Sequence, residues 1–409
     1  MLDWVNRNGK LLLAVRPLQS FAASFVSIFF AVYLKSIGLP LWQVGLVLTG
    51  GLLCSTLFNL VTGFLADRVG RRRMLVFFGL LSALGGAVFY LSTHTPLLVA
   101  VAVVSTLGYR GGFGSAQMLE QVILAQSCDD ERRTRLYAVR STVGSVATAV
   151  GSLFTGFVVV LQRLGYTESV SYRLMFAAYA ALNLAAVVLY SLLSADAEVE
   201  VVREEQAPLS PETRRYVARL SILFSMDALG GAFITQSLVA YWFFERFGLG
   251  MDMIGAIFSA SSLLAAVSFL LAARVSERIG LINTMVYSHL PANIMMAFVP
   301  YMPTLSAALF LYLGRSLLSQ MDVPTRESYT MAIVRPEERS RVSGLINLPR
   351  SLTLAVGPSI AGYVMQFVGL SLPFLLAGTI KAVYDVLLWA TFRDIKPPEE
   401  RADASQVNR

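Results

Sequence analysis

The chain has 409 residues, of which 56% are hydrophobic and only 14% are charged, whereas a soluble domain carries roughly 25% charged residues. With a mean hydropathy of +0.63, this much apolar surface cannot be buried in a soluble core, and the composition excludes disordered, collagen-like and disulfide-rich proteins. The net charge is +7, but the basic residues separate apolar stretches and form no stripe along one face, which argues against nucleic-acid binding. We therefore expect an integral membrane protein.

Apolar stretches long enough to cross a bilayer recur along the chain, since a hydrocarbon core of ~30 Å needs about 20 residues. Because lipid offers the backbone no hydrogen-bond partner, each stretch is predicted to be an α-helix. The twelve predicted spans are 11–35, 41–66, 74–95, 97–122, 137–161, 171–194, 214–243, 251–273, 281–300, 304–330, 343–367 and 370–392.

A polar, acidic stretch divides these spans into two sets of six. It ends in a helix start, with Ser210 as the cap and Pro211 in the first turn. The sequence thus predicts an N-terminal six-helix bundle over 1–194, a linker over 195–213, a C-terminal six-helix bundle over 214–393 and a tail over 394–409.

Arginine and lysine alternate from loop to loop, and this alternation orients the chain. One set of loops holds little beyond Lys35, Arg163, Arg173 and Arg246, whereas the opposite set carries most of the basic residues. We therefore expect a multi-pass protein of the cell (inner or plasma) membrane with both termini in the cytoplasm.

The two halves repeat each other weakly. Gly38 corresponds to Gly248, and Arg140 corresponds to Arg350, each pair being 210 positions apart. An offset that holds at several landmarks indicates that the halves arose by duplication, as in transporters built from parallel repeats.

A charged loop between the second and third spans carries a motif. Residues 63–73 read Gly-Phe-Leu-Ala-Asp-Arg-Val-Gly-Arg-Arg-Arg. This loop resembles the signature of the major facilitator superfamily, glycine-x-x-x-aspartate-Arg/Lys-x-glycine-Arg/Lys-Arg/Lys, and residues 273–280 hold a degenerate copy where that family has its second one. The resemblance implies an all-α fold of twelve transmembrane helices in two six-helix bundles, a monomer, and secondary active transport by alternating access.

The motif is a candidate conformational latch formed by Gly63, Asp67, Arg68, Gly70 and Arg71. Gly63 would allow two helices to approach closely, and Gly70 would permit the tight turn. By resemblance, Asp67 would pair with the start of the eleventh span near residues 340–344. An ordinary solvated loop that follows the positive-inside rule is the alternative.

Ionisable side chains at membrane depth are candidate sites, since each costs several kcal/mol unless it faces a partner or water. Arg110 and Arg315 lie near the middle of the fourth and tenth spans, at repeat-equivalent places, and two guanidiniums suit an anionic solute. Structural ion pairs are the alternative. Weaker candidates for solute binding are Arg16, Gln19, Gln117, Gln236, Asn293 and Gln320.

Carboxylates in the second half are candidates for proton coupling. Asp227 lies in the middle of the seventh span, and Asp322 is the second candidate. A buried salt bridge from Asp227 to an arginine is the alternative. Lys381 and Asp385, one helical turn apart in the twelfth span, are interpreted as a pair along one helix face.

Three further charged residues lie nearer the cytoplasm and are candidate gating residues. We expect them to form ion pairs between the two halves or to extend toward the membrane–water interface. They are Glu120, Arg326 and Glu327.

These features together predict a secondary active transporter that moves a small anionic or amphipathic organic solute, coupled to protons. No cofactor, metal or nucleic acid is expected, and the partners would be the solute and membrane lipids. An enzyme is not expected, because the chain has only His94 and His289 and no metal or nucleophile constellation. A multidrug/proton antiporter, or a non-transporting receptor or lipid-handling protein on the same scaffold, remains the alternative.

Overall fold

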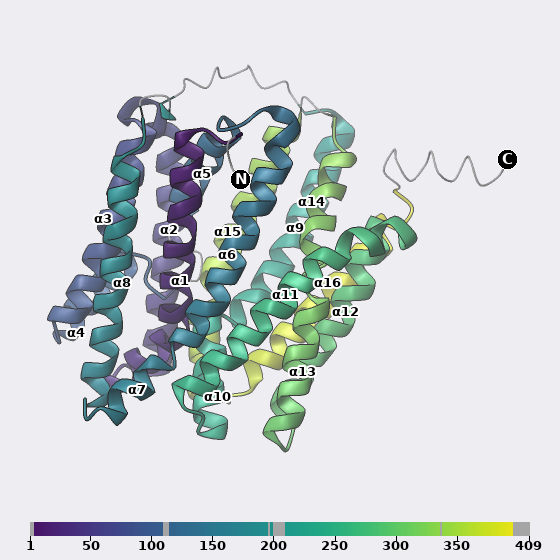
Figure 1. Ribbon diagram of the computed structural model, residues 1–409. Helices are drawn as coiled ribbons and strands as arrows, with labels where there is room; N and C mark the ends of the chain where they lie inside the picture. Colours follow the sequence, from purple (N-terminus) through teal and green to yellow (C-terminus); the bar gives the residue numbers. More distant parts are fainter. Residues whose placement is uncertain (1–3, 109–113, 195–196, 199–208, 336–337, 396–409) are drawn as a thin grey trace. The chain divides into compact units, whose positions relative to one another are not determined.

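A computed structural model describes residues 4–108, 114–194, 197–198, 209–335 and 338–395 (Figure 1). All regular secondary structure within these ranges is helical, which confirms the predicted all-α class. In the first half of the chain the helices are α1 (Arg7–Ser36), α2 (Leu41–Val69), α3 (Arg71–Leu91), α4 (Thr95–Val104), α5 (Gly114–Ala125), α6 (Asp130–Phe154), α7 (Phe157–Arg163) and α8 (Glu168–Ser191). In the second half they are α9 (Pro211–Phe233), α10 (Gln236–Phe247), α11 (Met251–Ile279), α12 (Leu281–Phe298), the 3₁₀ helix η2 (Val299–Tyr301), α13 (Leu305–Leu318), α14 (Asp322–Ala332), α15 (Arg339–Phe367) and α16 (Leu372–Phe392).

Each predicted span coincides with one helix or with two consecutive helices. The divided spans are 97–122 (α4 and α5), 137–161 (α6 and α7), 214–243 (α9 and α10), 281–300 (α12 and η2) and 304–330 (α13 and α14). Such breaks are tolerated at membrane depth only where protein or a water-filled cavity surrounds the backbone.

Eight of the described helical segments are long and apolar enough to cross a membrane. The helix α12 is not among them, because polar residues such as His289 and Asn293 lower its hydropathy. The polar groups of α12 thus lower its hydropathy below that expected of a span.

Packing divides the chain into two compact units. Unit 1 comprises residues 1–202 and 235–260, and unit 2 comprises 203–234 and 261–409. One boundary falls at the break between α9 and α10 and another falls within α11, so α10 packs with unit 1. There the Ser237 hydroxyl donates to the carbonyl oxygen of Ser27 at 2.6 Å. These two serines are 210 positions apart, which is the offset of the sequence repeat.

Glycine allows the closest helix contacts in unit 1. A Cβ on Gly151 of α6 would lie 2.5 Å from the carbonyl oxygen of Phe21 in α1, and one on Gly86 of α3 would lie 2.9 Å from the carbonyl oxygen of Phe176 in α8. Backbones approach this closely only where no side chain intervenes. The helices α1, α3, α6 and α8 are thereby held in register.

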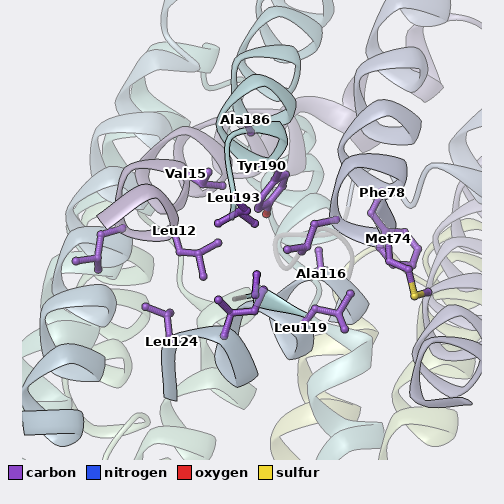
Figure 2. Packing of buried hydrophobic residues seen from close by; sticks show 14 of the residues in the cluster. Leu12, Val15, Met74, Phe78, Ala116, Leu119, Leu124, Ala186, Tyr190 and Leu193 are labelled. Carbon is purple, nitrogen blue, oxygen red and sulfur yellow. The ribbon is translucent and has the colours of Figure 1, made fainter. Parts of the chain in front are cut away.

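An apolar cluster occupies one end of unit 1, where α1, α3, α5 and α8 meet (Figure 2). Leu12, Phe78 and Leu119 are each at most 2% exposed. Tyr190 of α8 lies among these side chains with its ring in the cluster. Its hydroxyl group therefore has to find hydrogen-bond partners inside the unit.

Two glutamates accept hydrogen bonds from the first residues of other helices. Glu198 accepts from the backbone N–H groups of Arg71 and Arg72 at the start of α3, at 2.5 and 3.0 Å. Glu338 accepts from the Ser210 N–H at 2.5 Å and from the Thr213 hydroxyl at 2.6 Å, at the start of α9. Both carboxylates satisfy donors that a helix N-terminus leaves unpaired.

Glu338 should make the stability of unit 2 depend on pH. The hydrogen bonds from Thr213 and Ser210 lower the pKa of Glu338 from its usual value. A carboxyl group whose pKa is depressed by folding stabilises the fold above its unfolded pKa, and this contribution is lost as pH falls through the folded pKa. Glu338→Gln should therefore lower the Tm at pH 7, and the difference from wild type should shrink toward pH 4. Glu277→Gln, at an exposed position of α11, is the control; equal profiles for the two variants would contradict this role of Glu338.

Candidate functional site

Unit 1 contains a buried polar cluster around Glu120 of α5, whose side chain is fully buried. Arg140 of α6 donates to this carboxylate at 2.6 Å, and the Tyr190 hydroxyl of α8 donates to its other oxygen. Gln19 of α1 donates in turn to the Tyr190 oxygen at 2.8 Å. Four helices thus contribute to one hydrogen-bonded network, which holds both the carboxylate and the tyrosine in place.

Arg16 of α1 lies beside this network. A Cβ on Gly144 of α6 would lie 2.7 Å from the Arg16 Nε, so a glycine at that position makes room for the guanidinium. The Nε is buried without a hydrogen-bond partner, and the charges of Arg140 and Glu120 both act on the group. Arg16 makes no ion pair with a described residue, so two arginines face one glutamate and one positive charge is left uncompensated (2 − 1 = +1).

Unit 2 contains a larger charged cluster centred on Asp227 of α9, which is 5% exposed. One carboxylate oxygen accepts from Arg326 of α14 at 2.9 Å, and the other accepts from the ammonium group of Lys381 of α16. Arg326 also lies 3.4 Å from Asp322. Asp227 therefore faces two permanent cations at once.

A second part of the same cluster joins α12 to α16. The Nδ1 atom of His289 lies 2.8 Å from Asp385 Oδ1, and the Asn293 side chain donates to Asp385 Oδ2 at 2.8 Å. The other ring nitrogen of His289 lies 3.9 Å from Asp227. The histidine therefore connects the two parts of the cluster.

The charges of the unit 2 cluster do not balance when His289 is neutral. Asp227, Asp322 and Asp385 carry three negative charges, and Arg326 and Lys381 carry two positive charges (−3 + 2 = −1). One bound proton would make the cluster neutral. Uncompensated charge is costly in a buried site.

The predicted pair of Lys381 with Asp385 is wrong. Lys381 binds Asp227 and Asp385 binds His289, so each residue contacts another helix. The reason lies in the two glycines that follow Asp227 in α9: a Cβ on Gly230 would lie 2.7 Å from the Lys381 Cγ. Because these glycines leave space, the lysine stem crosses α9 and its ammonium group reaches Asp227. The alternative reading of Asp227, as a buried ion pair with an arginine, matches its contact with Arg326.

The other predicted solute-binding residues differ in their surroundings. Arg315 of α13 lies over the Tyr312 ring at 5.8 Å, and its Nε is buried without a partner. Both polar atoms of the Gln236 amide are also buried and without a hydrogen bond. Gln117 is half-buried. Arg110 lies outside the described residues, as do most of the predicted linker and tail.

The structure describes most residues of the latch motif but not the side chain of Asp67. Gly70 has φ +97°, a conformation that L side chains rarely adopt, and a Cβ there would lie 2.9 Å from Glu198. A Cβ on Gly63 would meet open space. Arg68 is exposed and Arg71 is buried, whereas the Asp67 side chain lies outside the described part of the chain.

The three predicted gating residues are placed inside their own units. Glu120 is engaged by Arg140 and Tyr190 in unit 1, and Arg326 by Asp227 and Asp322 in unit 2. Glu327, the next residue of α14, is exposed. The ion pairs of Glu120 and Arg326 thus stabilise helix packing within each unit.

The sequence analysis assigned no role in a site or an ion pair to three residues of these clusters: Arg140, Tyr190 and His289. His289 and Asn293 are four positions apart in one membrane helix, and that spacing places them on one face. The rule that intramembrane ionisable groups are site candidates would have identified the histidine. No sequence signal points to Tyr190, because its ring belongs to the apolar core.

Comparison with known proteins places these clusters in a familiar architecture. The sequence profile described as Major Facilitator Superfamily matches residues 15–321. An uncharacterized membrane protein of Saccharomyces cerevisiae is 25% identical, over 95% of this chain and 94% of its own length. Among solved structures, the nucleoside transporter NupG is similar with a TM-score of 0.73, at 14% identity over 95% of this chain and 99% of that one. The D-xylose-proton symporter is similar with a TM-score of 0.69, at 16% identity over 93% and 97% of the two chains.

Proposed function

Because the chain belongs to the major facilitator superfamily, we propose that it is a secondary active transporter that moves a small organic anion, or an amphipathic solute with an anionic group, by alternating access. The two six-helix halves predicted from the sequence, 1–194 and 214–393, would be its moving parts, joined by the linker 195–213 and followed by the tail 394–409. A multi-pass position in the cell membrane, both termini in the cytoplasm, contact with membrane lipids and a monomeric state belong to this proposal.

The uncompensated charge of Arg16 is the observation that carries the anionic character of the solute. Its guanidinium has no acidic partner among the described residues, whereas Arg140 beside it is neutralised by Glu120. An unpaired guanidinium at membrane depth costs several kcal/mol. A carboxylate or phosphate group on the solute would remove that cost and could accept two parallel hydrogen bonds.

Two further groups support a polar solute. Arg315 in unit 2 also lacks an acidic partner within the described part of the chain. The nitrogen and the oxygen of the Gln236 amide are both buried without a hydrogen bond to any described residue. Buried polar groups without partners are uncommon in proteins. Groups of this kind suit hydrogen bonds that are completed by a ligand.

Proton coupling is proposed through the charged cluster of unit 2, to which both Asp227 and Asp322 belong. The cluster is one positive charge short of neutrality when His289 is neutral, and the Asp322 Oδ1 atom is buried without a hydrogen-bond partner. Protonation would therefore change the charge of a buried site, and such a change can bias a conformational equilibrium.

A thermal-shift screen tests this proposal. The purified protein would be incubated with organic anions, organic cations, sugars, amino acids and lipids, each at pH 6 and pH 8. A ligand at 100 times its Kd adds about 2.7 kcal/mol of stability, so we expect hits among the organic anions that depend on pH. Hits confined to lipophilic cations would instead support a multidrug/proton antiporter, and hits confined to lipids would support a lipid-handling protein.

A further inference from the structure

His289 lies between two carboxylates of the unit 2 cluster. It is 4% exposed. Its Nδ1 faces Asp385 at 2.8 Å and the side-chain nitrogen of Asn293 at 3.1 Å, and its Nε2 faces Asp227 at 3.9 Å. A neutral imidazole carries one N–H and can donate to only one of them, whereas the imidazolium form donates from both nitrogens.

The groups around His289 come from four helices. Asp227 belongs to α9, and Asn293 belongs to α12 together with the histidine. The helix α14 contributes Asp322 and Arg326, and α16 contributes Lys381, Tyr384 and Asp385. The Tyr384 ring packs edge-on against the imidazole at 6.0 Å between centroids. The three aspartates and the two permanent cations of this set sum to a charge of −1 when the histidine carries no extra proton.

Asp227 and Asp322 are poorer places for that proton. Protonation of Asp227 would weaken its ion pairs with both Arg326 and Lys381, and protonation of Asp322 would weaken its contact with Arg326. Protonation of His289 breaks no ion pair and adds an attraction to Asp385 and to Asp227. An opposite charge at short distance favours the charged form of a titratable group.

We propose that His289 binds and releases the coupling proton of the transporter, with Asp385 and Asn293 as its positioning residues. This inference rests on the proposed transport function. When the coupling proton is bound, the imidazolium donates through Nδ1–H to Asp385 and directs Nε2–H toward Asp227. The proton leaves from Nε2, while Nδ1–H keeps its bond to Asp385 and fixes the tautomer. Asp227 then faces only its two cations, and the cluster carries one negative charge.

The small number of histidines permits a direct test. The chain contains two, and His94 is an exposed residue at the start of α4. In a His94→Gln background with ¹⁵N-labelled histidine, the imidazole signals report His289 alone. Imidazole changes charge between about pH 5 and 8, and we expect the ¹⁵N shifts to change from those of the imidazolium to those of one neutral tautomer between pH 5 and 9. The Nδ1–H form should predominate at high pH.

Positioning variants sharpen the test. Asp385→Asn should move the midpoint of the His289 titration to lower pH by one unit or more, that is, a tenfold or larger change in proton affinity, since a facing carboxylate is lost. Asn293→Ala removes a hydrogen bond to the same carboxylate and provides a second readout if Asp385→Asn does not fold. Glu277→Gln, which changes an exposed carboxylate of α11, should leave the midpoint unchanged.

Three results would overturn the inference. An imidazole that stays neutral from pH 5 to 9 binds no coupling proton, and one that stays charged throughout is a structural ion pair. A midpoint that moves in Asp322→Asn but not in Asp385→Asn would assign the proton to the other side of the cluster. The titration needs no solute, so its outcome is independent of whether the ligand screen finds an organic anion.

Discussion

Replacing Asp227 by asparagine is expected to lower the free energy of unfolding by about 3–5 kcal/mol, because removal of one member of a buried ion pair leaves the other charge uncompensated. Here two cations lose their partner, Arg326 and the ammonium group of Lys381. Neither can reach bulk water from its position, since both side chains are largely buried. Denaturant unfolding of the purified protein in detergent, with the wild type as reference, measures the loss.

A charge-balanced double variant separates lost ion pairing from a general packing defect. Asp227→Asn combined with Lys381→Met removes one negative and one positive charge and keeps an unbranched chain across Gly230. We expect the double variant to recover at least half of the lost stability, as coupled residues deviate from additivity. If the single variant were as stable as the wild type, Asp227 would not be the centre of the cluster.

Replacing Arg16 by glutamine is expected to weaken binding of an anionic solute 10- to 100-fold, because a hydrogen bond to a charged group contributes about 1.5–3 kcal/mol. Its effect on stability should be small or favourable, since Arg16 makes no ion pair with any described residue. Isothermal titration or the ligand-induced Tm shift measures the first quantity, and unfolding without ligand measures the second.

Arg140→Gln is the matched control for Arg16→Gln. It lies in the same unit and carries the same change of side chain, but it leaves the fully buried Glu120 without its guanidinium partner. We expect a loss of about 3–5 kcal/mol in stability. Similar stability losses in both variants, or an Arg16→Gln protein that binds anions normally, would contradict the assignment of Arg16 to the solute.

The membrane spans were predictable from sequence because hydropathy is a local property. Each predicted stretch coincides with described helices, and the serine pair in unit 1 has the offset of the sequence repeat. The breaks within spans were not predicted, since a local hydropathy pattern does not show what surrounds the backbone at Ile234 and Ser319, where α9 and α13 end. The packing of α10 with unit 1 likewise depends on contacts with α1 that no local pattern encodes.

The sequence identified several residues of the candidate site but not the contacts between them. Asp227, Asp322, Arg16 and Glu120 were identified because polar groups are rare at membrane depth. Their partners could not be identified, because pairing depends on which helices lie together. The lysine of α16 shows this: helical spacing predicted Asp385, whereas the glycines of α9 lead its ammonium group to Asp227.

Solute-dependent proton movement is the direct test of proton-coupled anion transport by this protein. The protein would be reconstituted into liposomes that contain a pH-sensitive dye, and an organic anion that stabilises it would be added outside. We expect a pH change in the lumen that requires both the anion and the protein, is lost in Arg16→Gln and is strongly reduced in His289→Gln. Anion uptake without any pH change, or a pH change driven only by lipophilic cations, would contradict proton-coupled transport of an organic anion.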